Sequence, residues 1–185
     1  MRVTFDKETH IYKIDGVVVP SNTQILSETG LVDSSWYTQE GADRGTAVHL
    51  ACQLHDEDDL GAVDPIVEPY LSAYKKFLAE SKFVPELIEV PMANHIHRYG
   101  TTIDRTGMLN GRDVLLELKT GVEQPFWPIQ LALQNECLPK RLIRAALQLR
   151  IDGTYRLHEF MDPNDRQVAL AAVTLYWWKK NNLKG

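Results

Sequence analysis

The stretch Gly100–Gly121, GTTIDRTGMLNGRDVLLELKTG, decides the fold of this chain. Asn110-Gly111 in its middle is typical of a two-residue β-hairpin turn. The residues after the turn, 114–120, alternate between apolar and charged side chains, as in a strand with two different faces. The stretch therefore predicts a β-hairpin with chemistry on one face.

Three charged side chains fall on the same face of this predicted hairpin. Alternation points Glu117 and Lys119 one way, and Leu116 and Leu118 the other way. Pairing across the turn would bring Asp104 close to Glu117 and Lys119. Two carboxylates beside one ammonium group are suited to metal-dependent phosphodiester hydrolysis, because carboxylates hold a divalent cation and lysine stabilises charge on phosphate.

The rest of the chain predicts a mixed α/β (α+β) domain, with a central mixed sheet flanked by helices. The other elements that we expect from apolar periodicity and turn residues are a hairpin over 11–19, a short helix opened at Ser21, helices over 36–53, 65–81 and 127–138, a strand over 86–92, a hairpin over 142–160, and a last helix after Asp162-Pro163 that carries Val168, Ala172, Leu175 and Trp178. No repeat or linker interrupts this order. We expect one domain over 1–185, with a helical part at about 20–82, a sheet core at about 85–160 and a C-terminal helix at about 163–182.

Composition narrows the class of protein. The 185 residues are 44% hydrophobic and 24% charged, which is ordinary for a globular domain with a substantial core. No apolar run has the length of a membrane span, and the two cysteines, Cys52 and Cys137, fit a reducing cytoplasm. The net charge of −5 argues against nonspecific coating of nucleic acid. Four arginines are candidates for a local phosphate-binding cluster, with solvated surface charge as the alternative: Arg141, Arg144, Arg150 and Arg156.

An acidic-x-Lys triplet by itself is weak evidence, and the chain contains its own control. Glu80-Ser81-Lys82 has the same pattern as Glu117-Leu118-Lys119. The first triplet ends a predicted helix and has no hairpin partner, so we interpret it as solvated surface. The second lies on a predicted strand, with Asp104 across the turn.

Five segments in this order resemble the PD-(D/E)XK nuclease superfamily, and most closely its RecB-type exonuclease branch. They are Val19–Leu26, which is similar to the opening of phage-encoded members, Arg44–His49, Gly100–Asp104, Leu116–Gly121 and Gln130–Gln134. The resemblance covers nearly the whole chain. It implies a restriction-endonuclease-like core.

The resemblance also implies roles for individual residues. His49, Asp104, Glu117 and the backbone carbonyl of Leu118 would bind one or two Mg²⁺ or Mn²⁺ ions. Lys119 and Gln130 would complete the catalytic set. The chain departs from the family at Gln134, where the pattern has tyrosine, and that change affects the end that binds substrate more than the metal site. It also lacks the cysteines that hold an iron–sulfur cluster in some members.

Several of these residues have simpler interpretations. Taken alone, His49 is a core histidine on an amphipathic helix, and Gln130 is an exposed helical residue. Glu89 is either a further acidic group of the site or a surface charge on an edge strand.

Other chemically active side chains match no motif. We interpret the acidic run Asp56–Asp59 as a solvated loop, and Trp127, Trp177 and Trp178 as packing residues rather than base-stacking ones.

The function implied by the resemblance is a metal-dependent exonuclease that shortens linear DNA, duplex or single-stranded, for recombination, replication or end processing. A phage or prophage protein acting in the bacterial cytoplasm with a single-strand annealing protein fits this activity, and assembly into an oligomer is one route to processivity. Two alternatives stay open: an endonuclease on the same core, and a nucleic-acid-binding module that has lost catalysis.

Overall fold

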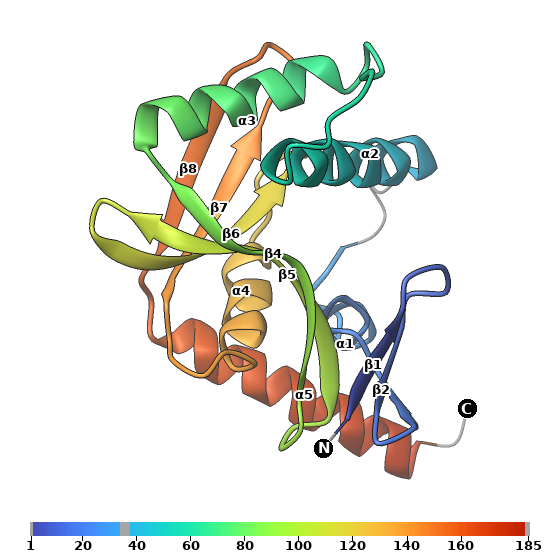
Figure 1. The fold of residues 1–185 in the computed structure, drawn as a ribbon. Helices are drawn as coiled ribbons and strands as arrows, with labels where there is room; N and C mark the ends of the chain where they lie inside the picture. The colour runs from blue at the N-terminus through green and yellow to red at the C-terminus, as the bar shows by residue number, and fades with distance from the viewer. Residues whose placement is uncertain (1, 34–37, 184–185) are drawn as a thin grey trace.

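The protein folds around a mixed five-stranded sheet, with a small antiparallel sheet beside it (Figure 1). The computed structural model describes residues 2–33 and 38–183. The small sheet has the order β1-β2-β3, and the large sheet has the order β4-β5-β6-β7-β8. In the large sheet β6 and β7 are parallel, and the other neighbours are antiparallel. The strands are β1 (Val3–Asp6), β2 (Ile11–Ile14), β3 (Val17–Val19), β4 (Val84–Asn94), β5 (Tyr99–Leu109), β6 (Arg112–Lys119), β7 (Ile143–Leu149) and β8 (Tyr155–Phe160).

Helices cover both faces of the large sheet, as the sequence predicted. One face packs against α2 (Gln39–Asp56) and α3 (Glu68–Ser81), and Figure 1 shows both helices above the sheet. The other face packs against α1 (Asn22–Glu28), α4 (Trp127–Asn135) and α5 (Asn164–Asn182). Each face has its own apolar cluster, so the strands between them are buried on both sides.

The hairpin predicted at Asn110-Gly111 is confirmed. Both turn residues have positive φ, 52° and 74°, as a type I′ turn requires. Arg105 pairs with Leu116 across the hairpin. One step further along this register, Asp104 lies opposite Glu117.

Strand β4 departs from the strict alternation expected over 86–92. Its register with β5 shifts between Pro85 and Leu87, which marks a bulge at Glu86. Glu89 then adopts a left-handed backbone conformation, with φ of 49°. Because non-glycine residues rarely adopt this conformation inside a strand, its surroundings must hold it there.

Helix boundaries differ from the expected ones by a few residues. Helix α2 begins after the Thr38 cap and extends to Asp56, beyond the expected end at Gln53; the expected start at Trp36 lies outside the described residues. Helix α3 begins at Glu68, three residues later than expected, and α4 ends at Asn135, three residues earlier.

The face that α5 buries differs from the expected stripe. Ala169, Ala172, Val173 and Tyr176 are buried, whereas Val168, Leu175 and Trp178 are exposed. The interpretation of Trp178 as a packing residue is therefore wrong, since 54% of it is exposed. Small side chains on the buried face let α5 pack closely on α4, and this packing orients the helix. The interpretation holds for Trp127, which is 2% exposed, and Trp177 is partly buried with its indole N–H donating to the His97 carbonyl at 3.0 Å.

The small sheet is attached to the end of β5. Strand β1 was not expected from the sequence; it pairs with β2 and completes the sheet. Gly100 packs directly on the Tyr12 ring, and a Cβ atom there would lie 2.2 Å from the ring. The Tyr12 hydroxyl is 2.7 Å from the Thr102 hydroxyl, and the Gly100 N–H donates to the Pro20 carbonyl at 2.9 Å. The small sheet is therefore held in a fixed position beside β5.

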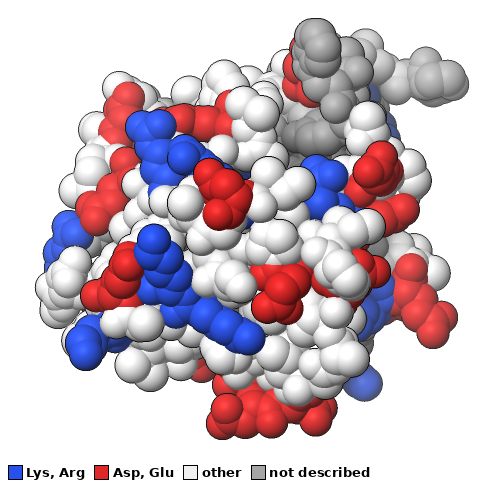
Figure 2. Space-filling model, turned by 90° about the horizontal axis from the view of Figure 1, so that it is seen from above, with Lys and Arg blue, Asp and Glu red and all other residues white. Residues whose placement is uncertain are grey.

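The four arginines considered as one cluster lie at opposite ends of β7. Arg141 and Arg144 lie where the strand begins, whereas Arg150 and Arg156 flank the turn at its other end, about 20 Å away at the usual rise per residue. The prediction of one cluster is therefore wrong. Figure 2 shows basic and acidic side chains interspersed on the face above α2 and α3. Among the described residues, no helix is both long and apolar enough to span a membrane.

Candidate active site

Strands β5 and β6 bring Asp104, Glu117 and Lys119 together. Asp104 and Glu117 are 5% and 4% exposed. The Leu118 backbone N–H donates to Asp104 Oδ2 at 2.8 Å, which fixes the Asp104 carboxylate against β6. Burial, and then the charge of Glu117, raise the pKa of Asp104, because two carboxylates share a poorly hydrated space.

Three donors hold the Glu117 carboxylate. Oε1 accepts from Lys119 Nζ at 2.9 Å and from Gln130 Nε2 at 2.6 Å, while Oε2 accepts from Gln134 Nε2 at 2.6 Å. A carboxylate oxygen has two acceptor sites, so Oε2 keeps one free for a further partner. Helix α4 thus supports the site through two glutamines four positions apart, one turn of helix.

Lys119 is held on two sides but keeps a proton to donate. Its Nζ lies 2.9 Å from Glu117 Oε1 and 2.8 Å from Gln130 Oε1, and 6.0 Å from the centre of the Phe126 ring. An ammonium group has three N–H donors, and these contacts use two. The side chain is 18% exposed, so the third can reach a group entering the site.

His49 reaches the site from α2. Its Nδ1 lies 3.3 Å from Glu89 Oε1 and 3.6 Å from Asp104 Oδ2, and its Nε2 lies 3.1 Å from the Leu118 carbonyl. Burial lowers the pKa of His49, but the charges of Asp104 and Glu89 outweigh it and raise the pKa overall. The resemblance at Arg44–His49 led us to expect this histidine at the site, and the structure brings it there.

Within the described ranges, His49, Glu89 and Asp104 form a group that could hold a metal ion, with one ligand atom from each lying within 4.8 Å of the others. An imidazole nitrogen and two carboxylates suit a divalent cation such as Mn²⁺. Burial and then the charge of Glu117 raise the pKa of Asp104, and a bound cation would offset both effects. The donor set therefore fits a metal site. Glu117 and the Leu118 carbonyl adjoin this group, and their roles as ligands stay predictions.

A second buried charge group, which we call the Arg105 cluster, consists of Asp56, Tyr74 and Arg105. Arg105 is fully buried and donates from Nε to Asp56 Oδ2 at 2.7 Å. The Tyr74 hydroxyl lies 3.0 and 2.9 Å from the two oxygens of the same carboxylate. From Nη1, Arg105 also donates to Glu89 Oε1 at 3.0 Å, so the cluster touches the active site at Glu89.

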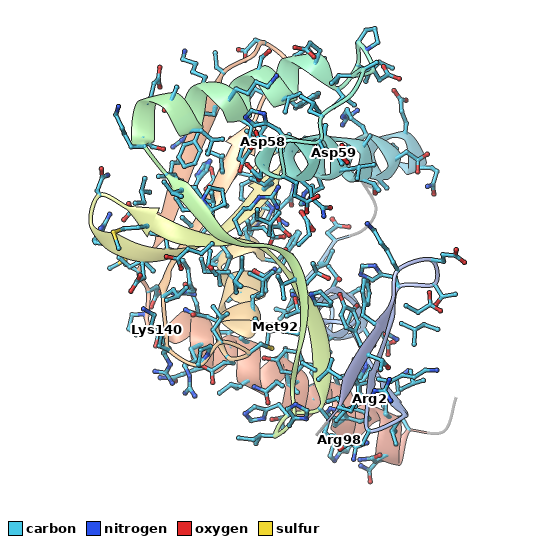
Figure 3. All side chains as sticks on the ribbon, in the orientation of Figure 1. Arg2, Asp58, Asp59, Met92, Arg98 and Lys140 are labelled. Carbon is cyan, nitrogen blue, oxygen red and sulfur yellow. The ribbon has the colours of Figure 1, made fainter. Side chains whose placement is uncertain are left out.

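The interpretation of Asp56 as part of a solvated loop is wrong. It is the last residue of α2, and its side chain is 2% exposed. A signal was present in the sequence, because Asp56 lies four and eight positions after the buried Cys52 and Val48, on the same helix face. Asp58 and Asp59 are exposed on the turn after α2, as expected, and are labelled in Figure 3.

Comparison with solved structures relates this geometry to known proteins. The chain is similar to an alkaline exonuclease (LHK-Exo) from Laribacter hongkongensis, with 12% identity, 87% of each chain covered and a TM-score of 0.50. The structure of LHK-Exo in complex with dAMP matches with 14% identity, 88% coverage of each chain and a TM-score of 0.52. A candidate exonuclease from Eubacterium rectale matches with 12% identity over 84% of this chain and 71% of that one, with a TM-score of 0.52.

The chain has the fold of these exonucleases. No protein-family model and no curated protein sequence matches it. The fold expected from the resemblance to PD-(D/E)XK nucleases is therefore confirmed by structure at low sequence identity.

Proposed function

We propose that this protein is a metal-dependent deoxyribonuclease that hydrolyses phosphodiester bonds from the ends of linear DNA. The observation that carries the proposal is the joint position of Asp104, Glu117 and Lys119 on one buried face, with His49 and Glu89 beside them. The fold supports it independently, because the solved structures that share this fold are an alkaline exonuclease and a candidate exonuclease.

His49, Glu89 and Asp104 would hold a Mg²⁺ or Mn²⁺ ion, with Glu117 Oε2 and the Leu118 carbonyl as candidates for further ligands. When bound, such an ion lowers the pKa of a coordinated water and neutralises charge on the phosphate. A histidine ligand favours Mn²⁺ over Mg²⁺, which prefers oxygen.

Lys119 would act on the reacting phosphate directly. Glu117 and Gln130 fix its ammonium group, so the remaining N–H is oriented before substrate arrives. A donor held in advance stabilises the negative charge of the pentavalent transition state at little reorganisation cost. Gln130 positions both Lys119 and Glu117, which makes it a positioning residue.

The activity fits phage recombination, replication or DNA end processing, and a single-strand annealing protein would be the natural user of the strand that an exonuclease exposes. Figure 2 shows basic and acidic side chains interspersed over α2 and α3, so this face offers no broad basic surface for nonspecific DNA binding.

The test is cleavage of end-labelled linear duplex DNA and of closed circular DNA, each with Mg²⁺, Mn²⁺ or EDTA. We expect metal-dependent loss of the linear substrate alone. Lys119→Ala should remove cleavage while the protein stays folded, because the contacts that it removes, to Glu117, Gln130 and the Phe126 ring, lie at the partly exposed end of the lysine side chain.

The matched control is Lys82→Asn in the exposed triplet Glu80-Ser81-Lys82. Lys82 has φ of 57°, a conformation that asparagine tolerates, so the variant removes a lysine without strain. It should cleave like the unmodified protein. Cleavage of the circle would replace the exonuclease proposal with an endonuclease, and full activity in Lys119→Ala would overturn the mechanism.

A further inference from the structure

The cleft that contains the candidate metal site continues to the small N-terminal sheet. The cavity has a volume of about 640 Å³, which is within the usual range for small-ligand sites. Its lining includes the site residues His49, Glu89 and Asp104. It also includes a second set of residues that have no role in the proposed hydrolysis: Phe5, Lys7, His10, Tyr12, Asn22 and Thr23.

The second set contains an aromatic group of the kind that binds nucleotide bases. The Phe5 ring stacks on the buried Tyr12 ring at 4.5 Å, and the His10 ring meets Phe5 edge-on at 5.1 Å. His10 is exposed, and it lines the cavity together with Phe5 and Tyr12. Aromatic side chains that stack on bases are the usual means of holding single-stranded nucleic acid.

The turn that presents these groups is ordered by local bonds. The Asp6 carboxylate accepts from the backbone N–H groups of Glu8 and Thr9 at 3.0 and 3.1 Å. Figure 1 shows this turn, between β1 and β2, extending toward the side of the molecule that carries α2. Lys7 lies on the turn, and its ammonium group has no hydrogen-bond or ion-pair partner among the described residues.

Two amide side chains that line the same cavity each have one buried atom without a hydrogen-bond partner in the described part of the chain. Asn22 and Gln134 are 4% and 1% exposed, and Asn22 Nδ2 and Gln134 Oε1 have no hydrogen-bond partner among the residues that the structure describes. A buried polar atom without a partner costs about 1–3 kcal/mol, so such atoms usually serve a ligand or a bound water. One donor and one acceptor on residues that line the same cavity suit a base edge, which offers both.

We propose that the small N-terminal sheet is a base-binding subsite for a single DNA strand. His10 and Phe5 stack on a base next to the reacting phosphate, Asn22 and Gln134 hydrogen-bond to its polar groups, and Lys7 neutralises a neighbouring phosphate. This inference rests on the proposed nuclease function, because the strand held there leads into the metal site. It also gives Gln134 a second role, with Nε2 on Glu117 and Oε1 toward substrate.

The test uses single-stranded oligonucleotides that carry the fluorescent base 2-aminopurine at one position, bound to Lys119→Ala protein so that the probe is not cut. Stacking quenches this fluorophore. His10→Asn removes the ring but keeps a residue that tolerates φ of 55°, and Lys7→Ala removes the charge. Lys13→Ala, on the same sheet but outside the cavity lining, is the matched control.

We expect His10→Asn to weaken binding about 5- to 150-fold, the range for loss of one stacking contact, and to reduce the quenching. Lys7→Ala should reduce the slope of log K against the logarithm of salt concentration by about one, the change expected for the loss of one phosphate contact. Mn²⁺ affinity should stay unchanged in both. Binding and quenching equal to the Lys13→Ala protein would overturn the subsite.

The outcomes separate this inference from the proposed function. DNA cleavage by the unmodified protein together with unchanged binding in His10→Asn would remove the subsite and leave the nuclease. Quenching that depends on His10, in a protein that cleaves no DNA with any metal, would support the subsite and remove the nuclease.

Discussion

The Arg105 cluster and the active-site group are both buried and lie next to each other, but they differ in how their acidic and basic side chains are paired. In the Arg105 cluster the guanidinium group faces the Asp56 carboxylate, and Tyr74 adds a hydroxyl donor. In the active-site group the carboxylates of Glu89, Asp104 and Glu117 share His49 and Lys119. Both groups thus bury charged side chains. They differ in that the active-site group contains more carboxylates than basic side chains.

Glu89 connects the two groups. Its Oε1 accepts from Arg105 at 3.0 Å and lies 3.3 Å from His49 Nδ1. Burial raises the pKa of Glu89, but His49 and Arg105 outweigh it and lower the pKa overall. The left-handed backbone at Glu89 is therefore held from both sides, and the Arg105 cluster acts as a support for one wall of the site.

The largest expected effect is a loss of stability when the cation of the Arg105 cluster is removed. Arg105→Ala leaves the buried Asp56 without its cation and leaves Glu89 with His49 alone, so we expect the free energy of unfolding to fall by about 3–5 kcal/mol. Urea unfolding measures this loss. The control is Arg112→Ala, which removes an exposed ion pair to Glu159 at 2.8 Å and should cost less than about 1 kcal/mol. Equal losses in the two variants would show that the Arg105 cluster does not support the fold.

The next effect tests the excess of negative charge in the site. Asp104→Asn removes one carboxylate from the metal group, so the variant should bind Mn²⁺ weakly and cleave no DNA. In EDTA its stability should be no lower than that of the unmodified protein, because the variant no longer buries this carboxylate or sets it against Glu117. At a Mn²⁺ concentration 100 times the Kd, the unmodified protein should gain about 2.7 kcal/mol and the variant little. Thermal unfolding with and without Mn²⁺ measures both, and an equal Mn²⁺ gain in the two proteins would contradict a metal site at Asp104.

The same two groups show which features of the fold and the site could be predicted from the sequence. The hairpin and the shared face of Asp104 and Glu117 depend on turn chemistry and alternation, which a sequence displays. Gln130 was expected at the site only from the resemblance to a family, because taken alone it reads as an exposed helical residue, whereas it is buried. Arg105 and Asp56 are 49 positions apart, and their pairing depends on how α2 lies across the sheet. The left-handed backbone conformation of Glu89 likewise depends on contacts with distant residues, His49 of α2 and Arg105 of β5. Sequence patterns predict which face a residue occupies, but they do not predict which distant side chain neutralises it.

Glu89 offers a finer test, because it belongs to both groups. Glu89→Gln keeps a hydrogen-bond acceptor for Arg105 but removes a charge from the metal group. We expect Mn²⁺ affinity to fall by at least about 10- to 100-fold, the loss seen for residues that only hold metal ligands in place, because Glu89 is itself a candidate ligand. The change in stability should be smaller than the one that Arg105→Ala causes. Calorimetric titration with Mn²⁺ measures the affinity. An unchanged affinity would assign Glu89 to the Arg105 cluster alone.

The smallest effect is expected from a single hydroxyl in the Arg105 cluster. Tyr74→Phe removes the donor to Asp56, whose carboxylate stays paired with Arg105, so we expect a loss of about 1 kcal/mol in urea unfolding. Mn²⁺ affinity should not change, because no active-site atom loses a contact. Tyr155→Phe is the matched control, since its hydroxyl donates to the exposed Glu80 carboxylate at 2.6 Å and water can replace it. A fall in Mn²⁺ affinity in Tyr74→Phe would mean that the two groups are coupled through Arg105 and Glu89. The Arg105 cluster would then contribute to metal binding as well as to the stability of the fold.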